Sequence, residues 1–247
     1  MWQHPQSRSV SVIGRLTYDG RTYRFVYTQG ALRIPGFRPL PGFRDLSASY
    51  AAHELFPVFA QRVMDPRRPD YQRYLERLGL EPSESSPWEQ IVHSGGSREG
   101  DTLQFKEAPR PVDGRVTVTF LAAGLRHIPG SRRTVDHVEN LVSAEQHAQA
   151  LNQLRENDGL WLRAEQGNPK NEAATLIATR EGVLLGYVPD ALCSGMRRLM
   201  ERGNAEARVA RVNGPDAPAH LRLVVTVWAP ASGEVVWDPD GSWAPLA

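Results

Sequence analysis

The sequence predicts a mainly β protein with helices inserted between its strands, an α+β fold arranged as two small β-rich modules. Runs rich in β-branched and aromatic residues recur along the chain, separated by turn residues such as Asp-Gly and Asn-Pro. Segments with helical spacing of apolar residues are short and stand between these runs. Prolines and glycines at 109–114 predict a boundary, giving modules at 1–112 and 113–231 and a C-terminal tail at 232–247.

The first module opens with two β-rich runs around Asp19-Gly20, which predict a hairpin. Ser47 is a suitable N-cap for the helix that follows a Pro- and Gly-rich loop. The expected elements are strands at 10–18, 22–28 and 102–105, helices at 47–60 and 69–80, and loops at 30–46 and 81–101, the latter around a short element at 88–92.

The second module is expected to alternate strands with two helices. Ser143 and Gln146 have the spacing of a capping box, and Pro189 and Gly203 are suited to the start and end of the second helix. The expected elements are strands at 115–122, 159–164, 174–179, 184–188, 206–212 and 221–228, helices at 143–154 and 189–202, a polar loop at 130–136 and a last apolar run at 235–237.

Composition narrows the class of protein. The 247 residues include 29 basic and 28 acidic side chains, a formal net charge of +1, which argues against coating long nucleic-acid tracts. No apolar run approaches the roughly 20 residues that span a bilayer, and the first residues lack the apolar region of a secretory signal. With one cysteine, Cys193, no intramolecular disulfide can form. We expect a cytoplasmic protein without membrane contact.

Complete catalytic motifs are absent from the sequence. The seven histidines and Cys193 show no His-x-x-x-His, His-Glu-x-x-His or Cys-x-x-Cys spacing, so no metal site is expected. There is no Walker loop, no Gly-x-Gly-x-x-Gly and no Gly-x-Ser-x-Gly. We therefore expect neither an enzyme nor a cofactor, and we interpret Cys193 as a small helix residue.

The most informative segment is Gln166–Ala174, between two expected strands. Asn168-Pro169 favours a turn, in which asparagine side chains bond their own backbone. A turn is a sufficient interpretation of this segment taken alone. The motifs Gly124-Leu125-Arg126-His127 before it and Gly186-Tyr187-Val188-Pro189 after it also allow a functional interpretation of the loop.

Taken in order, these motifs make residues of about 118–230 resemble the HIRAN domain. The series ends with a strand closing in Val225-Thr226-Val227-Trp228. The resemblance implies a modified OB-like β-barrel with inserted helices. It also implies single-stranded DNA or DNA ends as partners, because the domain in some replication-fork remodellers takes the 3′ end of single-stranded DNA in a pocket.

The resemblance assigns roles to Arg126 and His127, in the motif that precedes the Asn168-Pro169 loop. Arg126 falls on the arginine of the Gly124-Leu125-Arg126 motif and would contact phosphate. His127 stands where the remodellers have an aromatic residue that stacks on a base, which histidine can also do. Tyr187 has two interpretations, a core residue or a ligand contact.

The loop matches the family less closely. Asn168 matches the loop asparagine, whereas Lys170 replaces a tyrosine and Asn171 an aspartate that would bind a free 3′-hydroxyl. The tyrosine is a stacking platform worth about 1–3 kcal/mol per base, and Lys170 would offer a phosphate contact instead. Asparagine can still hydrogen-bond a hydroxyl but carries no charge.

The first 80 residues resemble the N-terminal subdomain of HipA-type proteins. The resemblance rests on the opening hairpin, Leu40-Pro41, Phe56–Arg62 and Asp65–Tyr71. No kinase body follows, since His-Arg-Asp and Asp-Phe-Gly are absent. The resemblance therefore implies a scaffold or interaction module.

Three functions remain open at this stage. The first is a protein that recognises single-stranded DNA or DNA 3′ ends, in DNA repair or defence. The second is a protein-interaction adaptor that acts through the N-terminal module and does not bind nucleic acid. The third is a metal-dependent phosphoester hydrolase, which the sequence supports least.

Overall fold

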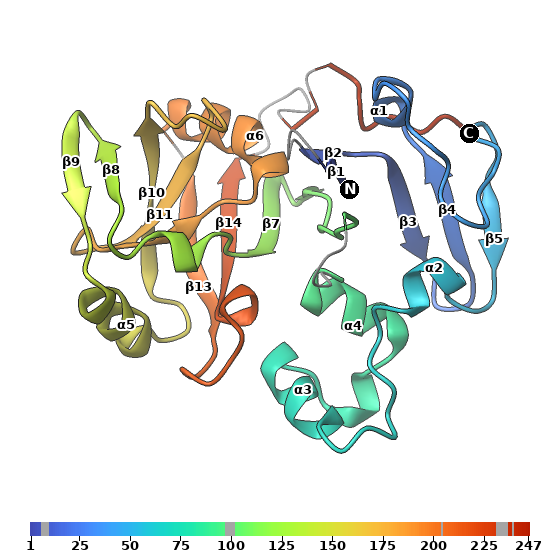
Figure 1. The fold of residues 1–247 in the computed structure, drawn as a ribbon, viewed down its shortest axis with the longest axis horizontal. Helices are drawn as coiled ribbons and strands as arrows, with labels where there is room; N and C mark the ends of the chain where they lie inside the picture. The colour runs from blue at the N-terminus through green and yellow to red at the C-terminus, as the bar shows by residue number, and fades with distance from the viewer. Residues whose placement is uncertain (6–9, 97–101, 204, 231–236, 239) are drawn as a thin grey trace. The chain divides into compact units, whose positions relative to one another are not determined.

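The computed structural model describes residues 1–5, 10–96, 102–203, 205–230, 237–238 and 240–247. The chain divides into two compact units, one made of Met1–Lys106 with Asp238–Ala247 and the other of Glu107–Trp237 (Figure 1). Strands dominate the second unit, whereas the first combines a small sheet with short helices. Within the described ranges, every helix is too short or too polar to cross a membrane.

The first unit is built on a three-stranded antiparallel sheet, β3 (Gly14–Tyr18), β4 (Tyr23–Tyr27) and β5 (Tyr50–Ala52). The expected hairpin is confirmed, with Tyr18 paired to Tyr23 across the turn. Asp19 Oδ1 accepts backbone hydrogen bonds at the turn, which is why Asp-Gly suits it. The expected strand at 10–18 is interrupted, because β2 (Val10–Ser11) pairs separately with β1 (Trp2–Gln3).

The helix expected at 47–60 is wrong. Residues Tyr50–Ala52 form β5, which pairs with β4, and only α2 (Pro57–Ala60) is helical. Pairing with an existing hairpin satisfies the backbone of this segment and outweighs its helical pattern. The strand expected at 102–105 is reduced to one bridge between Leu103 and Trp2.

The remaining helices of this unit are short. The expected second helix is confirmed as α3, whereas the short element expected at 88–92 is a longer helix, α4, and one helical turn lies in the expected loop 30–46. Their bounds are α1 (Gln29–Leu32), α3 (Tyr71–Leu78), η1 (Pro82–Glu84) and α4 (Pro87–Ser94).

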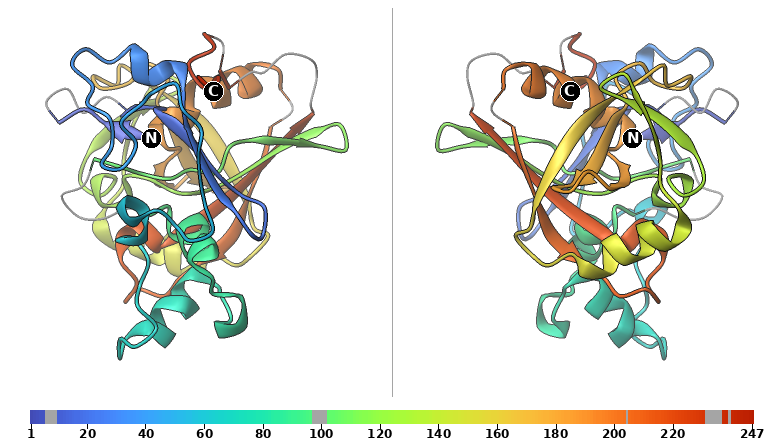
Figure 2. Two further views of the ribbon diagram at one scale, coloured as in Figure 1. Left: turned by 90° about the vertical axis from the view of Figure 1, so that its right-hand side faces the viewer. Right: turned by 90° about the vertical axis from the view of Figure 1, so that its left-hand side faces the viewer.

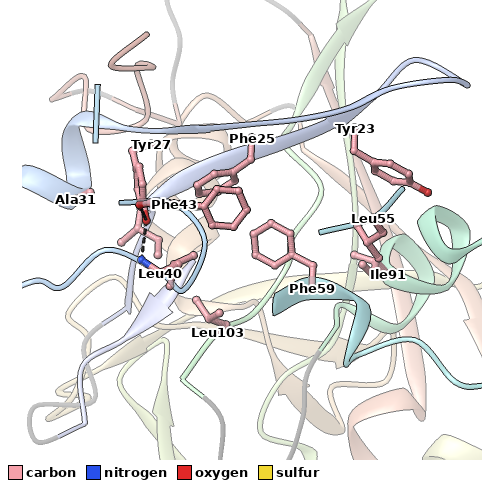
Figure 3. Close-up of a cluster of buried hydrophobic side chains, with 11 residues drawn as sticks. Tyr23, Phe25, Tyr27, Ala31, Leu40, Phe43, Leu55, Phe59, Ile91 and Leu103 are labelled. Atoms are coloured by element: carbon pink, nitrogen blue, oxygen red, sulfur yellow. Dashed lines mark hydrogen bonds between the residues drawn. The ribbon is translucent and has the colours of Figure 1, made fainter. Parts of the chain in front are cut away.

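An aromatic core holds the first unit together (Figure 3). The rings of Phe25, Phe43 and Phe59 pack with centroids 4.5–5.5 Å apart. Tyr27 is fully buried, and its hydroxyl donates to the Phe43 carbonyl and accepts from the Leu40 amide. The end of the chain belongs to this unit, since the Leu246 amide donates to the Tyr27 carbonyl.

The second unit is one large antiparallel sheet with two helices near opposite ends of it (Figures 1 and 2). The strands follow the order β12-β11-β10-β13-β14-β7-β6, and β8 and β9 form a hairpin attached to β10. Their bounds are β6 (Arg110–Val112), β7 (Arg115–Leu121), β8 (Arg132–Val135), β9 (Val138–Leu141), β10 (Gly159–Gln166), β11 (Thr175–Thr179), β12 (Leu184–Tyr187), β13 (Glu206–Val212) and β14 (Leu223–Pro230).

The sheet curls until the segment after β7 meets β12. Ala123, which follows β7, exchanges two backbone hydrogen bonds of 2.8 Å with Tyr187 at the end of β12. Because β12 and β7 lie far apart in the strand order, this bridge makes the sheet barrel-like. The mainly β, barrel-like fold expected for the second module is confirmed.

The polar loop expected at 130–136 is wrong, because β8 starts at Arg132. Asp136 and His137 form the two-residue turn to β9, both with φ of 50–64°. Two left-handed residues define a type I′ turn, and aspartate and histidine tolerate this conformation better than most residues. The last expected strand, 221–228, starts later, after η3 (Ala219–Leu221). Of the run expected at 235–237, residues 235–236 lie outside the described residues.

Both long helices of this unit are confirmed. In α5 (Ala144–Gln153), Ser143 and Gln146 form the expected capping box. Helix α6 (Asp190–Glu201) follows Pro189 and carries Cys193 on its buried side. Burial raises the pKa of the Cys193 thiol to about 12, so the thiol stays protonated at neutral pH.

Candidate nucleic-acid site

The sequence-predicted site residues occupy three segments of the second unit. Gly124 precedes the short helix η2 (Leu125–His127), which carries Arg126 and His127. The loop between β10 and β11 carries Asn168, Lys170 and Asn171, and Tyr187 ends β12. The Ala123–Tyr187 bridge joins the first segment to the last.

Gly124 is required at this junction. Its φ of +64° is one that residues with a side chain rarely adopt. A Cβ at this position would also lie 2.9 Å from Cδ2 of the Tyr187 ring. The backbone of Gly124 therefore packs directly against the Tyr187 ring.

Glu165, at the end of β10, is the centre of the site. Its side chain is 6% exposed, and it is the one buried carboxylate among the described residues. The carboxylate accepts hydrogen bonds from Asn168 Nδ2 and from the Tyr187 hydroxyl. Glu165 thus fixes one residue from each of two site segments.

Arg133, on β8, is the counterion of Glu165. Its Nε lies 3.4 Å from Oε1 of Glu165, and its Nη2 donates to the His127 carbonyl at 2.8 Å. Its guanidinium carbon also lies 5.9 Å from the centroid of the Tyr187 ring. One guanidinium therefore connects η2, β10 and β12.

Tyr187 is held as a neutral phenol by these surroundings. Burial raises the pKa of its hydroxyl well above the usual value near 10, and the neighbouring Glu165 carboxylate raises it further. The hydroxyl donates its proton to Glu165, so the phenol cannot ionise without losing that hydrogen bond. Tyr187 is half-buried.

The loop asparagines have structural roles. Asn168 Oδ1 accepts from the amides of Lys170 and Asn171, and Asn171 Oδ1 accepts from the Ala173 amide. Asn171 Nδ2 also donates to Asp190 Oδ1 at 3.2 Å, which ties the loop to α6. The turn expected from Asn168-Pro169 is confirmed, and it leaves the Lys170 side chain exposed.

The structure therefore brings part of the predicted site together. Asn168, Tyr187 and the backbone of His127 contact the Glu165–Arg133 pair, and Gly124 packs against Tyr187. Arg126 and Lys170 are exposed, and no contact of their side chains with this pair is found in the described part of the chain.

Sequence reasoning missed both central residues. Arg133 lay in a segment expected to be a loop, and Glu165 just beyond an expected strand end. Pairing of Glu165 with Val135 across β10 and β8 brings the two segments together. A local signal existed for the turn at Asp136-His137, but none indicated which strand the hairpin would join.

In the described ranges, no group of three or more His, Cys, Asp or Glu side chains is arranged to hold an ion. The chemistry that the site offers is hydrogen bonding from amides, cationic contact from arginines and lysine, and aromatic stacking.

Comparisons with known proteins place this site in context. A crystal structure of a protein from Lactobacillus plantarum is 19% identical, covers 47% of this chain and 97% of its own, and gives a TM-score of 0.34. The HIRAN domain of human HLTF is 17% identical, covers 47% of this chain and 81% of its own, and gives a TM-score of 0.31. The search of curated proteins finds no match. The family model of the HIRAN domain matches residues 116–232, so this part of the chain is a HIRAN domain.

Proposed function

We propose that the HIRAN domain of this protein binds single-stranded DNA and receives its 3′ end beside Tyr187. The network of Glu165, Arg133 and Tyr187 carries the proposal, because it fixes three segments from distant parts of the sequence around one place. Such a rigid support is what a binding site on loops needs. The match to the HIRAN family model supports the choice of DNA as ligand.

Each site residue has a role in this proposal. Arg126 binds a phosphate, with His127 beside it as a stacking surface for a base. Lys170, in the loop between β10 and β11, binds a second phosphate. Asn171 is the residue nearest in chemistry to a 3′-hydroxyl receptor, although its amide is already bonded to Asp190. Tyr187, which is half-buried, contributes an aromatic ring, and Gly124 allows the chain to approach it.

Binding is measured by fluorescence anisotropy with 3′-tailed, 5′-tailed and blunt oligonucleotides over a salt series. We expect the 3′-tailed probe to bind most tightly. Arg126→Ala should weaken binding and reduce the slope of log affinity against log salt by about 0.7, the contribution of one phosphate on a single strand. Arg15→Ala removes the same charge from an exposed position on β3 of the other unit and should leave binding unchanged. Absence of binding to all three probes at low salt would refute the proposal.

Participation in DNA repair or defence is the biological part of the proposal. It predicts that cells lacking the protein become more sensitive to DNA damage or to phage infection. Complementation with Arg126→Ala should fail where complementation with Arg15→Ala succeeds. Equal rescue by both variants would separate the cellular role from the DNA-binding site.

A groove in the first unit favours the second candidate, a protein-interaction adaptor. The groove has a volume of about 600 Å³ and is lined largely by apolar side chains, including Tyr18, Tyr23, Leu55, Val63 and Met64. A partner segment of similar character would fit it. Such a partner should be lost with Met64→Glu and retained with Arg126→Ala. The resemblance of this unit to HipA-type proteins stays a prediction.

A further inference from the structure

We propose that Trp161 and the two arginines that cover its ring, Arg163 and Arg180, form a second phosphate-binding surface that continues the DNA site along β10. The proposal rests on the proposed function, since it extends the same ligand beyond the 3′ end. Trp161 acts as a positioning residue, and the two guanidiniums make the contacts.

The three side chains form two cation–π contacts at an exposed position. Trp161 is 41% exposed and is the one aromatic among the large exposed apolar side chains of the described residues. The guanidinium carbon of Arg180 lies 3.9 Å from its ring centroid and that of Arg163 lies 5.0 Å away. The indole thus restrains two long cationic side chains that would otherwise be free to rotate.

The arrangement around Arg180 depends on a glycine. A Cβ on Gly159 would lie 2.6 Å from Arg180 Nε and 2.8 Å from its Nη2. The Trp161 indole N–H also donates to the Arg180 carbonyl at 3.3 Å. Gly159 therefore leaves the space in which the Arg180 guanidinium lies over the ring.

Neither arginine is strongly neutralised by the protein. Arg163 Nη1 lies 3.7 Å from the exposed Asp136 carboxylate, a surface pair of the kind that contributes little. No ion pair of Arg180 is found within the described part of the chain. A guanidinium stacked on an aromatic ring keeps its N–H donors at its edge, where they can bind a phosphate.

The sheet register places this surface beside the first site. Trp161, Arg163 and Glu165 are alternate residues of β10, so they share one face of the strand. Arg163 pairs with Leu176 on β11, and Leu176 pairs with Tyr187 on β12. Directly paired residues project to the same side of a sheet. Tyr187, Leu176 and Arg163 therefore project to the same side of the sheet, with Leu176 fully buried between the other two. From Arg163 the row continues along β10 to the exposed Trp161.

The spacing of residues along β10 suits a DNA strand that continues from the first site. Glu165 and Trp161 are four residues apart, or roughly 13 Å along a strand. A single-stranded DNA with its 3′ end beside Tyr187 would reach Arg163 first and then Arg180. The binding site would then hold several nucleotides, within the roughly 4–16 typical of one OB fold.

The test uses the full chain and a single-stranded 12-nucleotide probe with a free 3′ end, titrated by anisotropy over a salt series. Arg180→Ala should weaken binding roughly two- to fivefold and lower the salt slope by about 0.7. Gly159→Ala keeps every charge but displaces Arg180 from the ring, so its affinity should fall in the same direction. Thermal melts verify that each variant is folded, and Arg15→Ala is the control for net charge.

The outcomes separate this inference from the proposed function. If wild type binds and Arg126→Ala weakens binding while Arg180→Ala and Gly159→Ala do not, the second surface is refuted and the first site stands. If Arg180→Ala weakens binding and Arg126→Ala does not, the second surface stands and the proposed 3′-end site is refuted. If wild type does not bind the probe at low salt, both are refuted.

Discussion

The backbone of Gly124 lies against the ring of Tyr187, so closely that a Cβ at Gly124 would be 2.9 Å from the ring carbon Cδ2. Gly124 also has a φ of +64°. The contact is part of the junction at which the curled sheet meets itself, because the neighbouring Ala123 pairs with Tyr187. A change at Gly124 therefore acts on the fold and on the site together.

Gly124→Ala should lower the free energy of unfolding by more than its backbone strain alone. A left-handed alanine costs about 1–2 kcal/mol, and displacement of the Tyr187 ring adds to this. Gly130→Ala is the matched control, because Gly130 has a φ of +71° and open space where a Cβ would be. Urea denaturation measures both variants. Equal losses would mean that the Tyr187 ring yields without cost.

Glu165→Gln should destabilise the second unit by about 1–3 kcal/mol, because it leaves the Arg133 guanidinium without its buried counterion. Glutamine is nearly isosteric, so the loss reports charge and hydrogen bonding rather than volume. Glu139→Gln makes the same change in an exposed pair with Arg132 and should cost less than about 0.5 kcal/mol. If the two changes lower the free energy of unfolding equally in urea denaturation, the buried Glu165–Arg133 pair does not stabilise the site more than an exposed pair does.

Tyr187 should make the protein sensitive to alkaline pH. Its folded-state pKa is raised above the unfolded value near 10, so the folded state keeps a proton that the unfolded state releases. This contribution to stability is fully present below pH 10 and is lost as pH rises above it. Stability measured between pH 9 and pH 11 should therefore fall less steeply in Tyr187→Phe than in wild type. Some slope should remain, because burial also raises the pKa of Tyr23, Tyr27 and Tyr74.

Elements with local signals could be predicted from the sequence. The capping box of Ser143 and Gln146 and the Asp19-Gly20 hairpin depend on neighbouring residues alone, and both are confirmed. The segment at 50–52 has no such signal. Its strand exists because β4 offers an edge for pairing, which is a property of the tertiary structure.

The candidate site shows the same division. The Asn168-Pro169 turn follows from side-chain hydrogen bonds within four residues. Glu165 and Arg133 meet because β8 pairs with the end of β10, which lies much further along the chain. No periodicity within either strand indicates that register. The partner of a buried charge could be found only after the sheet was known.

Lys170→Tyr should change how the loop binds DNA. Lysine offers a phosphate contact, whereas tyrosine offers a stacking surface worth about 1–3 kcal/mol per base. We expect the salt slope of binding to fall by about 0.7 while affinity at moderate salt rises. Lys170→Ala is the control, since it loses the charge without gaining the ring. If both variants bind alike across the salt series, no base lies within reach of position 170.

Asn171→Asp should destabilise the loop, although it introduces the residue that would bind a 3′-hydroxyl. Asn171 Nδ2 now donates to Asp190 Oδ1 at 3.2 Å, and aspartate would place a second carboxylate against the first. Two such charges repel by about 1 kcal/mol at 4 Å in water, and the donor is lost as well. Urea denaturation should therefore show a loss of stability in the single variant that Asp190→Asn reverses, because the new amide donates in the opposite direction.

The double variant Asn171→Asp with Asp190→Asn also tests why this chain carries asparagine at the site. With the repulsion removed, the carboxylate introduced at position 171 accepts from the new amide at 190 and keeps further lone pairs that can accept from a terminal hydroxyl, whereas it would repel a terminal phosphate. Anisotropy with 3′-hydroxyl and 3′-phosphate probes should show a larger preference for the hydroxyl than in wild type. Asp190→Asn alone removes a carboxylate without placing one at position 171 and should not increase the preference for the hydroxyl. A double variant that regains stability without gaining this preference would place the 3′ end away from residue 171.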